Sequence, residues 1–165
     1  MSRWPEPLAR AYDACERLAQ AHYENFPVAS RLLPAPMRPH VAAVYAFARV
    51  ADDVADEGTA PAAERQAELL RWQQRLHDAV ASTNGNMPSD DRSDLILAAL
   101  AHSIRSLDLP VSLFDELLTF RLNAPDDKNL NEAQIEYRIG PRWLLEAFFG
   151  DRGVAGAEVI WSKRF

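Results

Sequence analysis

The chain has 165 residues, of which 48% are hydrophobic and 25% are charged. This length corresponds to about one domain, and the composition is that of an ordinary globular protein, which argues against intrinsic disorder. The 18 basic and 24 acidic residues give a formal net charge of −6. Because no basic stripe accompanies this acidic balance, nucleic acid is not an expected partner.

The sequence contains neither a long apolar run nor a pair of cysteines. No 18 consecutive residues are apolar, so we expect no transmembrane segment, and the N-terminus has no apolar secretory region. A single cysteine, Cys15, excludes an intrachain disulfide and a multi-thiolate metal site. We therefore expect a cytoplasmic protein in a reducing compartment.

Apolar residues in the first part of the chain recur every three or four positions, which is the period of an amphipathic helix. The first predicted helix runs from about Pro5 to Glu24. Prolines then interrupt the pattern and leave room for a short helix over Val28–Leu33. A long helix begins near Pro39 and is expected to end at Gly58, a residue common just after helices.

Three more helices are predicted further along the chain. One follows Pro61 and ends before the turn-rich loop Ser82–Ser89. Asp90 or Asp91 is expected to cap the next, and Pro110 opens the last. We find no strand-like alternation, so the predicted fold class is all-α.

One face of the helix that begins near Pro39 carries the polar groups of greatest interest. At about 100° per residue, Tyr45, Arg49, Asp52 and Asp56 fall within a sector of roughly 60°. Asp53 lies at the edge of this sector. The face therefore combines an aromatic ring, a guanidinium and two carboxylates one turn apart.

Four acidic residues at the end of this helix, Asp52, Asp53, Asp56 and Glu57, are electrostatically unfavourable. Like charges four residues apart oppose helix formation by roughly 0.2–0.5 kcal/mol, and the negative end of the helix dipole disfavours further anions. Arg49 can neutralise only one of the carboxylates. We therefore expect a cation to complete the site, and oxygen ligands favour a hard ion such as Mg²⁺.

This combination of groups is suited to an organic diphosphate. Magnesium held by one or two carboxylates keeps positions open for phosphate oxygens, and Arg49 offers a planar fork to the same oxygens. The π face of Tyr45 can stabilise a carbocation. The predicted chemistry is diphosphate ionisation in an apolar cavity. The alternative interpretation is an acidic cluster on the solvated surface.

Two segments resemble the squalene/phytoene synthase family: HYENFPVASRLLP at residues 22–34 and VYAFARVADDVADEG at residues 44–58. The likeness covers about residues 10–120 and is greatest to the hydroxysqualene synthases of the hopanoid pathway. It implies the N-terminal part of an all-helical, isoprenoid-synthase-type domain, here truncated. It also implies a Mg²⁺-dependent prenyltransferase-type enzyme that acts on farnesyl or presqualene diphosphate.

The resemblance also implies roles for individual residues. Asp52 and Asp56 match the first aspartate-rich motif, which binds Mg²⁺ and takes part in catalysis, and Asp53 lies beside them at the substrate. Arg49 matches the arginine that binds diphosphate.

A second set of residues is implied to contact the prenyl chain or the diphosphate. Tyr45 matches a catalytic tyrosine that lines the cavity, and Phe26 matches an aromatic residue of the prenyl channel. Asn25 stands where many relatives have a serine near the diphosphate.

The sequence departs from the family after about residue 120. The second aspartate-rich motif has no counterpart, and we interpret the aspartates of Asp90–Asp94 as helix-capping residues. We therefore divide the chain into residues 1–120, the family-like half, and residues 121–165, a divergent tail. Our hypothesis is that this tail results from a frameshift or belongs to a decayed copy.

Loss of the second half of the site leaves a second functional hypothesis open. The chain is then a catalytically inactive helical fragment or interaction module. Apolar faces that lack a partner in the truncated fold are expected to cause oligomerisation or peripheral membrane contact.

Overall fold

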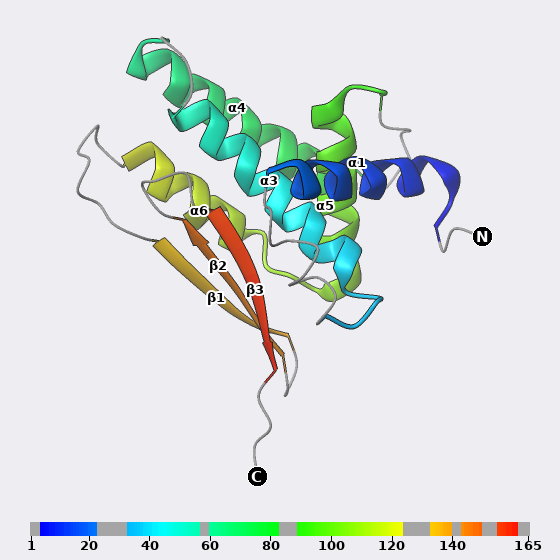
Figure 1. Ribbon diagram of the computed structural model, residues 1–165. Coiled ribbons are helices and arrows are strands. Elements are labelled where there is room, and N and C mark those ends of the chain that lie inside the picture. Colours follow the sequence, from blue (N-terminus) through cyan, green and yellow to red (C-terminus); the bar gives the residue numbers. More distant parts are fainter. Residues whose placement is uncertain are drawn as a thin grey trace.

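In the computed structural model, the part of the chain described below consists of helices and one small sheet (Figure 1). The described residues are 4–22, 33–56, 60–82, 89–123, 133–139, 143–149 and 155–161. Five helices lie within these ranges: α1 (Glu6–His22), α3 (Arg38–Asp56), α4 (Ala62–Ala81), α5 (Arg92–Leu107) and α6 (Ser112–Asn123).

These helices confirm the elements predicted from the apolar period, with ends that differ by a few residues. Pro39 occupies the second position of α3, where its missing N–H costs no helical hydrogen bond. The short helix predicted over Val28–Leu33 falls mostly outside the described residues, as does Gly58. The all-α prediction therefore holds for the helical part, residues 6–123.

Helix α3 is the centre of this helical part. It packs against α1, α4, α5 and α6, and every residue from 40 to 48 is buried. Phe47 stacks on Trp72 of α4 with ring centroids 5.4 Å apart, and its ring meets the edge of Phe114 of α6 at 5.6 Å. A helix buried on all sides must be apolar nearly all round, which explains the run of alanine and valine in its sequence.

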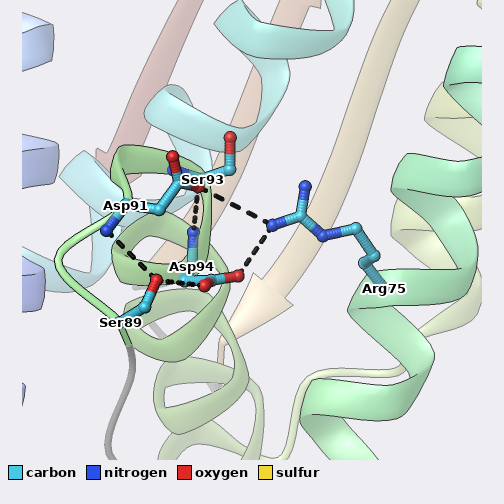
Figure 2. A network of polar contacts seen from close by, with 5 residues as sticks. All are labelled: Arg75, Ser89, Asp91, Ser93 and Asp94. Carbon is cyan, nitrogen blue, oxygen red and sulfur yellow. Dashed lines mark hydrogen bonds and ion pairs between the residues drawn. The ribbon is translucent and has the colours of Figure 1, made fainter.

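The start of α5 is fixed by a polar network on the surface (Figure 2). The Asp91 carboxylate accepts hydrogen bonds from the backbone N–H groups of Ser93 and Asp94, at 3.0 and 3.4 Å. The Ser89 hydroxyl donates to the Asp94 carboxylate, and Arg75 of α4 donates to it at 2.7 Å. The hydrogen bond from Ser89, followed by that from Arg75, lowers the pKa of Asp94. Asp91 is thus the N-cap, which confirms the capping interpretation.

Three strands follow the helices and were not predicted. Strands β1 (Ala133–Ile139), β2 (Trp143–Phe149) and β3 (Ala155–Trp161) form an antiparallel sheet in the order β1-β2-β3. Strand β3 lies beside α3, and β1 lies beside α6 (Figure 1). The sheet lies in the divergent tail, beyond the helical part to which the all-α class applies.

The sequence signal for this sheet was uneven. Strand β1 alternates apolar and polar residues, which is the two-residue period of a half-buried strand. Strand β2 reads WLLEAFF, a dense apolar run whose period does not distinguish a strand from a buried helix. Pairing with its neighbours decides its conformation.

None of the helices within the described ranges has the combination of length and apolar character that a membrane crossing requires.

Replacing the N-cap residue tests the assignment of the α5 start. We expect Asp91→Ala to lower the free energy of unfolding by about 1 kcal/mol, because two backbone donors lose their acceptor. Asp91→Asn keeps an acceptor and should lose much less. Urea denaturation measures all three proteins. The matched control is Asp90→Ala, which removes an exposed ion pair with Arg10 and should cost less than about 0.5 kcal/mol. Equal losses at positions 90 and 91 would contradict the cap.

The single cysteine provides a probe of core integrity. Cys15 is fully buried in α1, and burial, followed by the charge of Glu16, raises the pKa of its thiol to about 12. We expect native protein at pH 8 to react with Ellman's reagent at least ~100-fold more slowly than protein in urea, because the thiol is both protonated and inaccessible. Fast labelling in native buffer would show that α1 does not pack as described.

Candidate active site

The candidate site occupies the second half of α3. Tyr45 and Asp52 lie in the interior, with only 3% and 4% of their surface exposed. A solvated surface cluster is therefore excluded for Asp52. An aspartate carboxylate is rarely buried to this extent in proteins unless it is paired or binds a ligand, because its charge loses hydration.

Arg49 forms an ion pair with the aspartate at the edge of the predicted face. Its Nη2 lies 2.6 Å from Oδ1 of Asp53, one turn further along α3, and the two side chains are 16% and 32% exposed. Asp53 is thus a carboxylate that Arg49 neutralises, in agreement with the prediction that the arginine relieves one of the acidic residues. This ion pair fixes the guanidinium at the C-terminal half of the helix, close in sequence to Asp52.

The C-terminal end of α3 carries negative charge in addition to the ion pair of Arg49 with Asp53. The last turn of this helix contains no basic residue, and it carries Asp53 and Asp56 where the helix dipole is negative. Carboxylate oxygens are ligands for hard cations, so the chemistry of these donors fits Mg²⁺. Among the side chains that the structure describes, no three His, Cys, Asp or Glu residues gather at a metal-binding distance.

Several predicted site residues lie outside the part of the chain that the structure describes. These are Phe26, Asn25 and the side chain of Asp56, whose backbone ends α3. The structure therefore brings together Tyr45, Arg49, Asp52 and Asp53 on one helix, and the remaining roles stay predictions.

A polar cluster that was not predicted from the sequence lies at the other end of α3. His40 is buried with 5% of its surface exposed, next to Tyr12 of α1 and Ser103 of α5. One signal was present, since His40 falls on the same helical stripe as the buried Val44 and Phe47, at spacings of four and seven residues.

Comparison with known proteins places the chain in a family. The squalene/phytoene synthase profile matches residues 19–126, which include the whole of α3. The chain belongs to the squalene/phytoene synthase family, whose members are prenyltransferases. The family match ends close to the end of α6, at Asn123.

Individual relatives agree with this membership. The chain is 37% identical over 106 residues to a phytoene synthase of Rhodobacter capsulatus, covering 64% of the chain and 29% of that protein. It is 36% identical over 111 residues to a phytoene synthase of Mycobacterium tuberculosis, covering 67% and 33%. It is 41% identical over 92 residues to a hydroxysqualene synthase of Zymomonas mobilis, covering 52% and 29%. The chain thus spans about a third of the length of these relatives.

A double-mutant cycle measures how strongly the interior couples Arg49 to Asp53. We expect a coupling free energy of about 1 kcal/mol from Arg49→Ala, Asp53→Ala and the double variant, because partial burial reduces solvent screening. The exposed pair Asp13–Arg17 on α1, at 3.6 Å and with the same spacing, is the matched control and should couple by less than about 0.5 kcal/mol. Equal coupling in both pairs would mean that solvent screens the Arg49–Asp53 pair as strongly as it screens the exposed pair on α1.

Proposed function

We propose that this chain binds a prenyl diphosphate together with Mg²⁺, as the N-terminal half of a squalene/phytoene synthase-type active site. The observation that carries the proposal is the burial of the Asp52 carboxylate on the same helical face as Tyr45 and Arg49. A buried carboxylate that shares a helical face with an arginine and a tyrosine is the kind of ligand that a metal–diphosphate site requires.

Each residue has a distinct part in this proposal. Asp52 and Asp56 hold the metal, which neutralises charge on the diphosphate and makes it a better leaving group. Arg49 binds diphosphate oxygens, and Asp53 keeps its guanidinium in place through the ion pair at 2.6 Å. Tyr45 faces the prenyl cation that remains when the carbon–oxygen bond breaks and its electron pair leaves with the diphosphate.

For the substrate, we propose farnesyl or presqualene diphosphate and a reaction of the hydroxysqualene synthase type. The similarity to the Zymomonas mobilis hydroxysqualene synthase supports this choice. So does the segment NFPVAS at residues 25–30, which resembles that branch of the family. Membership of the family is equally compatible with a phytoene synthase, the name of the other relatives.

A second candidate function is a helical binding module without turnover. It rests on the same face of α3, because carboxylates and an arginine can bind a metal and a phosphate group without any further chemistry. In this case the first aspartate-rich motif binds a ligand that the chain does not convert.

Calorimetry with a non-hydrolysable farnesyl diphosphate analogue tests the binding step. We expect binding that requires Mg²⁺ and that weakens at least tenfold in Asp52→Asn and in Asp56→Asn, because each loses one anionic ligand of the metal. The matched control is Asp78→Asn, an exposed residue of α4 with a partner on its own helix, Gln74. Circular dichroism confirms that each variant folds. Unchanged affinity in both site variants would refute the metal assignment.

An assay of pyrophosphate release from farnesyl and presqualene diphosphates then separates the two candidates. Release that depends on Mg²⁺ and on Asp52 indicates an enzyme. Binding without release indicates the module.

A further inference from the structure

Three polar side chains surround the hydroxyl group of Tyr12, and the four residues together come from three helices. The Tyr12 hydroxyl of α1 lies 3.1 Å from Nδ1 of His40 in α3, 2.8 Å from Nδ1 of His102 and 3.0 Å from Oγ of Ser103, both in α5. Tyr12, His40 and Ser103 are buried, with 3%, 5% and 0% of their surface exposed. We call these four residues the tyrosine–histidine cluster.

The ring of Trp4, just before α1, packs against three rings of this cluster. It stacks on Tyr12 with centroids 5.3 Å apart and meets the rings of His40 and His102 edge-on, at 5.9 and 4.7 Å. The two imidazoles are nearly parallel to each other at 6.2 Å. Trp4, just before α1, is therefore held against side chains of α3 and α5.

The hydrogen bonds around Ser103 favour one tautomer of His40. The Ser103 hydroxyl donates its only proton to the backbone carbonyl of Ala99, at 2.9 Å, so its oxygen can only accept further hydrogen bonds. Nδ1 of His40 lies 2.9 Å from that oxygen. The proton of this hydrogen bond must then belong to His40.

The proton of Tyr12 does not change this result. It can be donated to His102, its nearest partner, or to Ser103, and in both cases Nδ1 of His40 still carries a proton. Donation to His40 would leave two lone pairs facing each other between His40 and Ser103 at 2.9 Å, which is repulsive.

The location of His40 on α3 links the cluster to the candidate site. Nine residues separate His40 from Arg49, which at about 100° per residue puts them roughly 180° apart around the helix. The cluster thus holds the N-terminal half of α3 on the side away from Arg49. A rigid helix rotates as one body. The hydrogen bonds of His40 to Tyr12 and Ser103 therefore also set the direction in which Arg49 and Asp52 face.

We propose that His40, protonated on Nδ1, is a positioning residue that fixes the rotation of α3 against α1 and α5 and so orients Arg49 and Asp52. The tautomer and the attachment of α1 are independent of any ligand. The effect on ligand binding rests on the function proposed above.

Nitrogen-15 NMR tests the tautomer. In the uniformly labelled full chain at pH 7.5, the His40 ring, assigned by its loss in His40→Asn, should show a protonated Nδ1. A ring protonated on Nε2 alone would overturn the proposal.

Two amide replacements test the position of the donor. The side-chain amide of His40→Asn falls near Nδ1 and can still donate to Ser103, whereas that of His40→Gln falls nearer Nε2. We expect hydrogen exchange of α1 amides to stay near the wild-type rate in His40→Asn and to accelerate at least tenfold in His40→Gln. His77→Asn, a replacement of an exposed histidine paired with Asp115, is the control and should leave α1 unchanged. Equal exchange in the Asn and Gln variants would overturn the proposal.

Calorimetry with the farnesyl diphosphate analogue tests the link to the site. We expect binding to weaken at least fivefold in His40→Gln and to be retained in His40→Asn. A Gln variant with loosened α1 and full affinity would refute the positioning role. If the wild-type chain does not bind the analogue at all, the proposed function fails, while the tautomer and exchange results decide the structural part on their own.

Discussion

The neighbouring helices bury every residue of α3 from 40 to 48. This burial determines which polar groups the helix can carry and how the other helices pack around it. Each polar group on such a helix loses its hydration and must regain the lost free energy from partners. His40 does so through hydrogen bonds to α1 and α5, and Arg49 through an ion pair with Asp53. Side chains of α4 and α6 meet the same helix through the rings around Phe47.

This constraint separates two kinds of polar residue along one helix. At the N-terminal half, hydrogen-bonding groups from three helices contact one another, so the cluster stabilises a single packing arrangement. At the C-terminal half, several carboxylates share a region with one arginine and a negative helix end. The first arrangement joins side chains of the protein to one another, whereas the second is the face that we propose binds a cation and a phosphate group. The same helix thus carries the hydrogen-bonded cluster at one end and the proposed binding face at the other.

Most of the helical part and one face of α3 could be predicted from residue spacing, because the apolar period of a helix is set by the backbone. Asp91 as a cap was also predictable, since its acceptor serves donors two and three residues away. The sheet was not, because WLLEAFF suits a buried helix as well as a strand and only pairing with β1 and β3 decides. The partner of Arg49 was equally open, since Asp52 and Asp53 both lie within reach in sequence.

The sequence alone determined the family, the helices and the alignment of Tyr45, Arg49 and Asp52, because these depend on local order and on the rotation per residue. Only the tertiary structure decided that Asp52 is buried and that His40 meets Tyr12 and Ser103, residues that lie 28 and 63 positions away. Contacts over such distances arise from the packing of whole helices, and no local pattern in the chain encodes which side chains those helices bring together.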